Sequence, residues 1–587
     1  MTNQEIADLL RNVAAALIVK KENNFKIVAY ENAAEVIEVS NIEIKDFWQQ
    51  GKLQEIPGVG VNIAKHLDEL FKTGEVSYFK KIFKDLPPAM FLLMNVSGIG
   101  PKTAYKLCLN LKIKNPKTAL DQLEKAALKG QIRKIDGFGE QSEKDILNSL
   151  NQYKKREDRM LLPFASLLAQ RVIGYLQEDN PELKIEPLGS LRRMTATVGD
   201  IDLAVATNKP KEVIDRFIAF PEAREVVVSG KNTARIIHNN NQQIDLKTMR
   251  PEAYGALLQH FTGSKQHNIH LREIAIKKGL SLSEYGIKKQ GKLKNFRSEE
   301  DFYHALGMSF IPPELREDSG EIEAAMANKL PQLIETKDIK GDLHVHSDFL
   351  IEPSHDLGSN SMNSLLKEAF HLGYEYLGFS EHNPNFSLHT SEEIIDLLKR
   401  KKDKIDKLNY SRTKKLPIHA INSLEIDIKP NGELAIPKEG FKYLDMAIAS
   451  VHSSFKMNKK EMTERVLHGL NHPKVKIFGH PSGRKLGERD SYELDWDQIF
   501  AFCLKNNKFL EINAFPNRLD LPDTLVHEAV KRGVKMIINS DTHEINQLRQ
   551  INYGVTVARR GWATKKDIIN TLSYDKIKKV LNLKGGE

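Results

Sequence analysis

The feature that most constrains the fold of this chain is a set of aspartates placed inside apolar, strand-forming segments. Asp200 and Asp202 lie in the run Gly199-Asp200-Ile201-Asp202-Leu203, where strand alternation directs both carboxylates to one face. Asp245 lies on the second strand of a hairpin predicted over 234–248. Carboxylates this close repel one another unless a cation lies between them. The pattern therefore predicts a sheet that holds a pair of Mg²⁺ ions, which take oxygen ligands and phosphates.

A short basic segment precedes these aspartates. It reads Gly189-Ser190-Leu191-Arg192-Arg193, in which the first two residues predict a tight anion-binding turn and Arg193 can neutralise a triphosphate. An isolated pair of alternating aspartates is usually a solvated strand edge. The turn, the arginine and the three aspartates in this order predict nucleotidyl transfer instead.

A pattern of apolar residue, any residue, glycine, apolar residue and glycine occurs three times in the first 150 residues. Each copy stands between an apolar helix end and a helical pattern. Paired glycines allow a tight turn after which backbone N–H groups face a phosphate without reading a base. One copy would be an ordinary helix connection, but three predict DNA binding. The copies are Ile56-Pro57-Gly58-Val59-Gly60, Val96-Ser97-Gly98-Ile99-Gly100 and Ile135-Asp136-Gly137-Phe138-Gly139.

The second half of the chain is rich in histidine, with 13 of the 19 histidines in 341–587. His344 and His346 alternate on one face of an opening strand, which is a chelating arrangement. Further candidates follow apolar runs, at the strand ends where (β/α) barrels keep their active sites. The pattern predicts a metal site of imidazoles and carboxylates. These further candidates are His382, Glu425, His452, His480, Asp541 and His543.

Composition excludes several other classes of protein. Two cysteines, Cys108 and Cys503, exclude a disulfide framework and a Cys-rich zinc site, and indicate a reducing cytoplasm. No apolar run reaches the roughly 20 residues of a membrane span, and no signal peptide is predicted. The net charge of +9 is spread over both halves, so 251–297, with nine Lys or Arg against three Glu, is the better electrostatic candidate for nucleic acid. We expect a monomer.

With these motifs in this order, residues 1–316 resemble the family X DNA polymerases, whose core is like that of DNA polymerase beta. The resemblance implies that Asp200, Asp202 and Asp245 are the catalytic metal ligands, with Asp245 nearest the attacking primer hydroxyl. It also implies that the glycine turns, through Gly58, Gly60, Gly98, Gly100, Gly137 and Gly139, are helix-hairpin-helix motifs that bind DNA. The implied nucleotide-binding residues are Gly189, Ser190, Arg193, Gly199, Phe261, Gly263, Asn268 and Arg272.

Three positions depart from the pattern of this family. His260 stands where the family often has Tyr beside the pocket phenylalanine, which bears on sugar selection. Gln243 stands where an arginine often supports the third aspartate. His66 stands where beta-type enzymes place the lysine of a deoxyribose-phosphate lyase, and Lys65 would lie on a different helix face. A beta-type lyase is therefore not predicted.

Residues 341–575 resemble the PHP (polymerase and histidinol phosphatase) domain, a distorted (β/α)₇ barrel with up to three divalent metals. The resemblance implies Mn²⁺ or Zn²⁺ and phosphodiester hydrolysis, and a His/carboxylate site suits these ions better than Mg²⁺. Ile351 falls where the family usually has an aspartate ligand, and Asp356, or as second choice His355, is the predicted substitute. Ser380-Glu381-His382 replaces the usual Thr-Asp-His.

The sequence thus predicts a multidomain chain of α+β and α/β class. It combines a helical helix-hairpin-helix region, a nucleotidyltransferase palm and a distorted (β/α)₇ barrel. The expected divisions are a helical N-terminal domain (1–85), a helix-hairpin-helix subdomain (86–155), a palm (156–250), a nucleotide-binding subdomain (251–316), a linker (317–338) and a PHP domain (339–587).

The leading functional hypothesis is a DNA polymerase that fills short gaps in repair. It takes dNTPs and gapped or nicked DNA, uses Mg²⁺ or Mn²⁺ at the palm, and carries a 3′–5′ exonuclease in its PHP domain. One alternative is a PHP nuclease whose polymerase half only binds DNA, and another is a non-catalytic DNA end-binding protein. A small-molecule nucleotidyltransferase shares the Gly-Ser and aspartate pattern, but the glycine turns and the segment Phe261–Ser264 argue against it.

Overall fold

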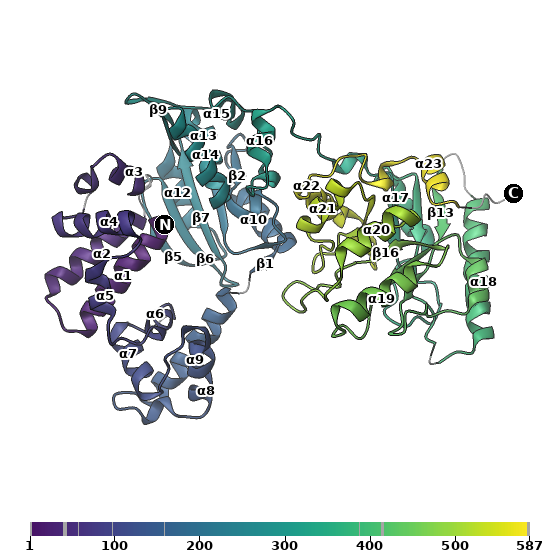
Figure 1. Cartoon of the computed structure of the whole chain (residues 1–587), viewed down its shortest axis with the longest axis horizontal. Helices are drawn as coiled ribbons and strands as arrows, with labels where there is room; N and C mark the ends of the chain where they lie inside the picture. The colour runs from purple at the N-terminus through teal and green to yellow at the C-terminus, as the bar shows by residue number, and fades with distance from the viewer. Residues whose placement is uncertain are drawn as a thin grey trace.

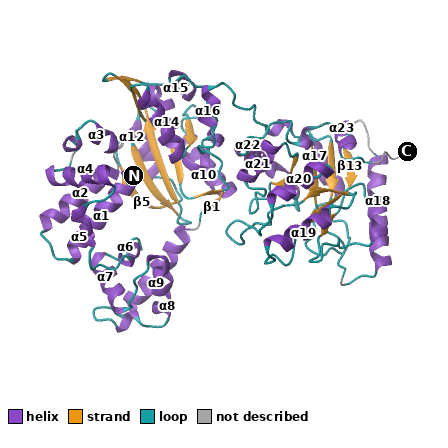
Figure 2. Ribbon diagram, in the orientation of Figure 1, coloured by secondary structure: helices purple, strands orange, loops and turns teal. Residues whose placement is uncertain are grey.

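The computed structural model describes residues 3–38, 44–56, 58–96, 98–157, 159–386, 388–411 and 416–583. Pro57 and Ser97, which belong to the first two glycine turns, lie outside the described residues. A helical region, a palm with its helices and a second α/β unit follow one another across the molecule (Figure 1). In Figure 2 the part of the molecule farthest from the second unit is drawn as helices and loops, and the orange strands appear in the other two parts.

The first part is helical, as its apolar periodicity predicts. Ile6, Leu10, Val13 and Leu17 are buried along one face of α1. Helices α1–α5 enclose one hydrophobic core and α6–α9 enclose another. The helices are α1 (Asn3–Val19), α2 (Asn24–Glu38), α3 (Ile44–Gln49), α4 (Val61–Thr73), α5 (Ser77–Phe83), α6 (Ala89–Leu93), α7 (Pro101–Asn110), α8 (Pro116–Leu128) and α9 (Glu140–Glu157), with 3-10 turns η1 (Leu53–Glu55) and η2 (Ile132–Lys134).

Each of the three glycine turns leads into a helix. Helices α4, α7 and α9 begin directly after the second glycine of a turn. The first glycine has a positive φ in every copy, 79° at Gly58, 80° at Gly98 and 77° at Gly137. A side chain would be strained there, so the repeated glycine meets a backbone requirement of the turn.

The palm is a five-stranded sheet in the order β2-β4-β7-β6-β5. Strands β4 and β7 are parallel, and β6 pairs with β7 as the predicted antiparallel hairpin. Ile201, Leu203 and Val205 share a core with α10 and α12, so Asp202 projects from the opposite face. The elements are β1 (Met160–Leu161), α10 (Leu162–Gln177), β2 (Ile185–Pro187), α11 (Gly189–Arg192), β3 (Thr197–Val198), β4 (Ile201–Ala206), α12 (Pro210–Ile218), β5 (Ala223–Ser229), β6 (Thr233–His238) and β7 (Gln243–Met249).

The segment after the palm has its own core, which extends into the predicted linker. The buried core residues Ile322 and Ala325 lie on α16, within 317–338. Glu321 of the same helix lies 2.6 Å from Nδ1 of buried His267. The first half of the linker therefore packs against the subdomain before it. The elements are η3 (Pro251–Ala253), α13 (Tyr254–Thr262), α14 (Lys265–Lys277), β8 (Leu280–Ser283), β9 (Gly286–Lys289), β10 (Lys292–Lys294), α15 (Glu299–Ala305), η4 (Pro313–Leu315), α16 (Glu321–Met326) and η5 (Thr336–Asp338).

The second α/β unit is a distorted barrel of parallel strands. Its two sheets have the strand orders β11-β12-β13 and β14-β15-β16-β17-β18. Strand β14 begins just after β13 ends, so β13 and β14 together occupy one of the seven strand positions of the barrel. Pairing of Val345 with Thr542 joins the first position to the last, which closes the barrel as predicted. The strands are β11 (Gly341–Val345), β12 (Tyr376–Phe379), β13 (His419–Asn422), β14 (Glu425–Asp427), β15 (Ala447–Ser450), β16 (Val475–Phe478), β17 (Phe509–Asn513) and β18 (Met536–Asn539).

Helices surround this barrel and also contact the polymerase half. Trp562, in the loop after α22, packs against the core of the segment that follows the palm. The helices are α17 (Met362–His371), α18 (Ser391–Tyr410), η6 (Lys438–Tyr443), α19 (Lys459–Leu470), α20 (Trp496–Asn506), α21 (Asp523–Arg532), η7 (Ile545–Gln550), α22 (Ile551–Arg560), η8 (Ile569–Thr571) and α23 (Tyr574–Val580).

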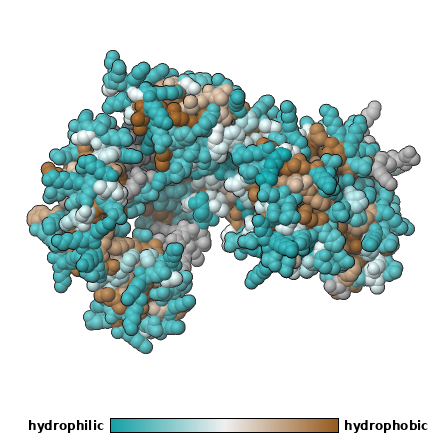
Figure 3. All heavy atoms as spheres, viewed as in Figure 1, coloured by the Kyte–Doolittle hydropathy of each residue, from teal (hydrophilic) through white to brown (hydrophobic). Residues whose placement is uncertain are grey.

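The visible surface is mostly hydrophilic, with a hollow beneath the palm between the helical region and the barrel (Figure 3). No helix in the described parts of the chain is long and apolar enough to cross a membrane.

Candidate active sites

Three carboxylates meet on the open face of the palm. The register of the parallel strands β4 and β7 places Asp202 directly opposite Asp245. Asp200 lies just before β4, and one oxygen of each aspartate falls within 4.8 Å of the others. Burial, together with repulsion from Asp200 and Asp245, raises the pKa of Asp202 to about 7. A divalent cation with oxygen ligands would remove this repulsion, so the three side chains fit a metal site.

Two neighbouring side chains hold the third carboxylate. Gln243 Nε2 donates to Asp245 Oδ2 at 2.6 Å, so this departure from the family pattern still supports the aspartate. Arg235 Nε donates to Asp245 Oδ1 at 2.7 Å from the adjacent strand. Arg235 is absent from the predicted site, although its position opposite Asp245 in the hairpin register would have identified it.

The glycine turns of the predicted triphosphate site lie beside the aspartates. Gly189 has a φ of 54°, and a Cβ there would lie 3.1 Å from Asp202 Oδ2. A Cβ at Gly263 would lie 3.2 Å from Arg193 Nη1. Arg193 donates to the carbonyl of Thr262 at 2.6 Å. The structure thus brings these residues together, with Ser190 on the same short helix as Gly189, and with Gly199 adjoining Asp200.

The remainder of the predicted nucleotide pocket comes from α13 and α14. Lys247 Nζ lies 4.5 Å from the centroid of the Phe261 ring. Asn268 Nδ2 donates to the carbonyl of His260 at 2.7 Å. Burial and the nearby charges of Arg272 and Lys247 lower the pKa of His260 to about 3. This histidine is therefore neutral at physiological pH.

The second and third glycine turns border one surface groove. Gly98 and Gly137 line a cavity of about 480 Å³ together with Lys102, Lys106 and Phe138. Lysines beside exposed helix N-termini suit the phosphates of a DNA backbone. No described residue of the first turn lines this groove.

His66, which follows the first glycine turn, is held by aromatic neighbours. Its Nδ1 lies 2.8 Å from the hydroxyl of Tyr30, and its ring stacks on Tyr78 with 4.7 Å between centroids. Burial lowers its pKa. A histidine has no primary amine with which to form a Schiff base, and the absence of a beta-type lyase stays a prediction.

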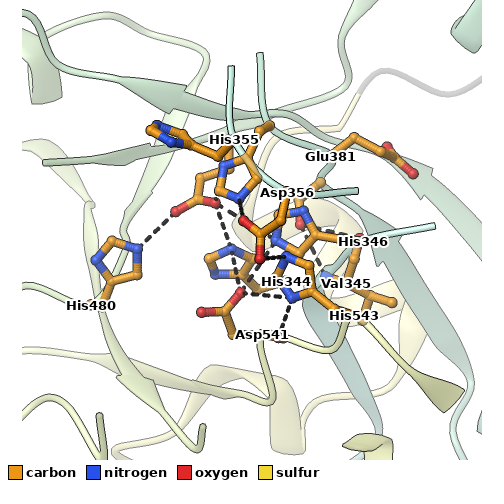
Figure 4. Close-up of polar contacts among 12 residues, drawn as sticks. His344, Val345, His346, His355, Asp356, Glu381, His480, Asp541 and His543 are labelled. Carbon is orange, nitrogen blue, oxygen red and sulfur yellow. Dashed lines mark hydrogen bonds and ion pairs between the residues drawn. The ribbon is translucent and has the colours of Figure 1, made fainter. Parts of the chain in front are cut away.

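A second cluster lies at the carboxyl ends of the barrel strands (Figure 4). His344, His346, Glu425 and Asp541 are buried, and each offers a ligand atom within 4.8 Å of the others. Overlapping groups of the same kind bring in the remaining predicted residues: His346 with His382 and His543, and His382 with Glu425 and His452. His480 Nε2 lies 2.8 Å from Glu425 Oε1.

Glu425 is the electrostatic centre of this cluster. His382 Nδ1 lies 2.9 Å and His344 Nε2 3.2 Å from its Oε2 atom. Burial alone would raise the pKa of Glu425, but the histidines hold it well below its usual range. For His382 the directions are reversed. Burial alone would lower the pKa of this histidine, but Glu425 and Asp356 raise it to about 10.

Within the described parts of the chain, several imidazole nitrogens in this cluster have no hydrogen-bond partner. These buried nitrogens are Nε2 of His344, both ring nitrogens of His346 and Nε2 of His452. Buried polar atoms are nearly always satisfied in native proteins, so these nitrogens fit the role of metal ligands. Nitrogen and carboxylate donors together fit divalent ions such as Mn²⁺ or Zn²⁺.

Both predicted substitutes for the absent aspartate lie at this cluster. Asp356 is 3.4 Å from His382 Nε2 and 3.5 Å from His543 Nε2. His355 Nε2 is 3.3 Å from Asp427 Oδ1, which in turn is 2.6 Å from His452 Nδ1. Asp427 is absent from the predicted set, and its contact with Nδ1 orients His452.

Comparison with known proteins matches four parts of the chain to family models. They are a helix-hairpin-helix domain (1–76), a SAM-like helix-hairpin-helix tandem (91–152), a DNA polymerase beta thumb (257–317) and a PHP domain (342–515). The DNA polymerase/3′-5′ exonuclease PolX of Bacillus subtilis (strain 168) is 31% identical over 585 residues, which cover 99% of each chain. The chain belongs to the PolX family. DNA polymerase lambda of Rattus norvegicus is 24% identical over 45% of this chain and 48% of its own length.

The predicted metal site of this PolX family member omits one buried carboxylate. Glu511 on β17 accepts from His480 N at 2.7 Å and lies 2.7 Å from His344 Nδ1. By fixing the far nitrogen of His344, it orients the Nε2 atom toward the cluster. An acidic residue inside the apolar run Phe509–Asn513 is the signal that would have identified it.

Glu381, which replaces the aspartate before His382, points away from the cluster. It pairs with buried Lys401 at 2.6 Å and bonds to the hydroxyl and backbone N–H of Ser347. The PolX barrel therefore uses this substitution to secure the loop after the opening strand. His382 itself still reaches the cluster.

Proposed function

We propose that this chain fills short gaps in DNA during repair and removes nucleotides from 3′ ends at its PHP domain. As a PolX family member it is a DNA polymerase with a 3′–5′ exonuclease, and it acts on DNA and dNTPs. The observation that carries the proposal is the register of Asp202 opposite Asp245, beside the Gly189 turn. The preference for gaps, a monomeric state and a cytoplasmic location are parts of the proposal.

At the palm, Asp200, Asp202 and Asp245 would hold Mg²⁺, with Mn²⁺ as a substitute. The bound ions would polarise the α-phosphate and neutralise the leaving pyrophosphate. Gln243 and Arg235 fix the orientation of Asp245, the aspartate assigned to the primer end. Arg193 and the backbone at Gly189 contact the triphosphate. Neutral His260 adds no charge to the pocket that holds the nucleotide.

At the barrel, the His and carboxylate cluster would hold up to three Mn²⁺ or Zn²⁺ ions, which supply Lewis acidity for phosphodiester hydrolysis. Glu511 orients His344, and Asp427 orients His452 through Nδ1. Asp356 reaches the cluster from the loop after β11.

Gapped-primer extension tests the polymerase assignment. The intact chain should extend a primer across a gap of a few nucleotides with Mg²⁺, and Asp202→Ala should reduce the rate by about 1,000-fold or more because one ligand is lost. Asp215→Ala, at an exposed position on α12 paired with Lys211, is the matched control and should extend normally. Failure of the wild-type chain to extend any gapped primer would show that the assignment is wrong.

Degradation of a 3′-labelled strand tests the exonuclease assignment. Mn²⁺-dependent activity should disappear in His344→Ala and survive in Asp202→Ala. His371→Ala, an exposed histidine on α17, serves as control. Activity that persists in His344→Ala would contradict the assignment to the barrel.

A further inference from the structure

The basic segment 251–297 ends in a lysine-rich hairpin that neither metal cluster uses. Strands β9 and β10 pair antiparallel, with Gln290 and Gly291 in the turn between them. All the lysines of these two strands are exposed. Arg297 Nη2, just beyond the hairpin, lies 3.8 Å from Glu252 Oε1, whereas none of these lysines pairs with a carboxylate in the described parts of the chain. They are Lys288, Lys289, Lys292 and Lys294.

Two of these lysines face each other across the turn. Lys289 is the direct cross-strand partner of Lys292. Like charges at opposed positions repel one another, so this pair weakens the hairpin unless an anion lies close to both. Lys294 projects from the same face as Lys292, and its Nζ lies 5.2 Å from the centroid of the Phe296 ring. An anionic ligand is the most direct compensation for the positive charge on this face.

A cavity beside the hairpin connects it with a predicted nucleotide-binding residue. The cavity has a volume of about 440 Å³ and lies between the end of α3 and strands β8 and β9. Lys288 lines it together with Arg272, which the sequence assigns to the nucleotide site. The amide side chains of Gln49, Gln50 and Gln290 also line it, and no carboxylate among the described residues does. Lysine, arginine and glutamine are among the side chains that contact DNA phosphates.

The hairpin lies across the palm from two of the glycine turns. In Figure 1, β9 and α3 lie at the top of the polymerase half, α7 and α9, which follow the second and third turns, lie at the bottom, and the palm strand β7 lies between them. A duplex held by those turns brings its primer end to the aspartates of the palm, and only the template strand continues beyond. Helix α14 runs from the nucleotide-site turn to this sheet over 13 residues, or roughly 20 Å, which matches about six nucleotides at about 3.4 Å each.

We propose that Lys288, Lys289 and Lys292, the hairpin lysines, bind phosphates of the template strand ahead of the base that is being copied. Lys288 reaches this strand at the cavity beside Arg272, and the opposed pair next to the turn binds it farther on. The contacts are to phosphates alone, so they do not depend on the DNA sequence. This inference rests on the polymerase function proposed above and assigns a surface to one segment of its DNA substrate.

Equilibrium binding of the full chain to two primer-templates tests the hairpin lysines. One template extends a single nucleotide beyond the primer, and the other extends about ten nucleotides, past the distance that α14 spans. Replacement of all three hairpin lysines by alanine should weaken binding of the long template about tenfold and leave binding of the short one unchanged. The slope of log affinity against log salt concentration should become less steep by about 2 on the long template, because each phosphate contact to a single strand contributes roughly 0.7.

Two further triple variants serve as controls. Alanine at Lys399, Lys404 and Lys407, which are exposed on α18 at the far end of the barrel, removes the same charge and should leave both affinities unchanged. Arginine at the three hairpin lysines should bind the long template as the wild type does. Equal weakening by the two alanine variants, or an equal loss on both templates, would overturn the proposal. Lysines on an edge strand also discourage pairing with other chains, and if that is their whole role the alanine variant will self-associate in gel filtration with its DNA affinity unchanged, which contradicts the proposal.

Binding without dNTP separates this inference from the proposed function. In primer extension on the long template, the alanine variant of the hairpin lysines should raise KM for DNA about tenfold with kcat unchanged, since no residue at the aspartates is altered. If the wild-type chain extends no primer but the binding difference is found, the polymerase proposal fails and the template-binding surface stands. If extension is normal and the variant binds both templates as the wild type does, the template-binding surface is wrong. Circular dichroism confirms that each variant is folded.

Discussion

The two metal clusters of this molecule differ in how the negative charge of their carboxylates is balanced. At the palm, three aspartates face one another and Asp200 is exposed, while burial and repulsion from its neighbours raise the pKa of Asp202. At the barrel, carboxylates alternate with imidazoles, and Glu425 is stabilised as an anion by the histidines around it. The palm therefore depends on cations that arrive from outside, whereas the barrel has compensating charge of its own.

This difference should govern how tightly each site holds its metal. Three oxygen ligands on an open sheet face suit ions that are exchanged with each substrate and are shared with its phosphates. A buried set of nitrogen and oxygen ligands, fixed by Glu511 and Asp427 behind the histidines, suits ions that remain bound.

The largest expected effect concerns metal retention. After gel filtration in metal-free buffer, the wild-type chain should retain Mn²⁺ or Zn²⁺ at the barrel, while the palm loses its Mg²⁺. Elemental analysis should find the retained metal unchanged in Asp202→Ala and reduced severalfold in His344→Ala. If Asp202→Ala loses as much transition metal as His344→Ala, the proposed contrast between the sites is incorrect.

The next effect is on the pH dependence of the palm. Since the pKa of Asp202 is raised to about 7 in the absence of a cation, Mg²⁺ must displace a proton at lower pH. The apparent Mg²⁺ affinity in primer extension should fall about fivefold as the pH drops from 7 to 6, and little between 8 and 9. Titration of Mg²⁺ in primer-extension assays at each pH measures this apparent affinity. A flat profile across this range would show that Asp202 is already ionised.

The palm was the more predictable of the two regions, for a physical reason. Strand alternation is local, so Asp200 and Asp202 can be placed on one face from five consecutive residues. The barrel strands were also identifiable from their apolar runs, and the pair His344 and His346 from strand alternation. The overall fold follows from these local patterns combined with the family resemblance.

Residues that act across strands or domains could not be found in this way. Arg235 reaches Asp245 only through hairpin register, and Glu511 reaches His344 across a barrel. The choice between Asp356 and His355 depended on a loop path that no periodicity encodes, and the structure places both at the cluster. Such contacts depend on tertiary packing, which a single sequence does not determine.

Stability without metal gives a third contrast between the clusters. The pKa of Asp202 is higher in the folded chain than in the unfolded chain. Ionisation of Asp202 therefore destabilises the fold as the pH rises above the pKa of the unfolded state, and the full penalty is present above about pH 7. Asp202→Asn should therefore stabilise the metal-free chain by about 4 kcal/mol at pH 8, and by little near pH 4.

The same neutral substitution at the barrel should have the opposite sign. The pKa of Glu425 is lowered on folding, so its charge contributes stability above its unfolded pKa, which is lost as the pH falls. Glu425→Gln should destabilise the chain by about 3 kcal/mol at pH 8, because it leaves buried imidazolium groups without a counter-charge. Calorimetric unfolding in chelator measures both variants. Shifts of the same sign would contradict the comparison.

The smallest expected effect links the two halves. Arg560 on α22 donates to the Arg193 carbonyl at 2.6 Å and to Glu317 Oε1 at 3.1 Å. The same Glu317 oxygen accepts from Arg193 Nε at 2.9 Å, so a barrel residue fixes the arginine assigned to the triphosphate. The side chain of Asp523, 2.7 Å from Arg560 Nη2, anchors Arg560 from the barrel side.

Arg560→Ala should therefore raise KM for dNTP by about threefold in gap filling, as expected for the loss of one charge-assisted contact that acts through a neighbour. The kcat of extension and the rate of 3′-end degradation should change little, because neither metal cluster is touched. Arg549→Ala, which removes an exposed arginine paired with Glu368, is the control. An equal loss in both activities would instead indicate general destabilisation, and an unchanged KM would show that the polymerase half positions Arg193 without help from the barrel.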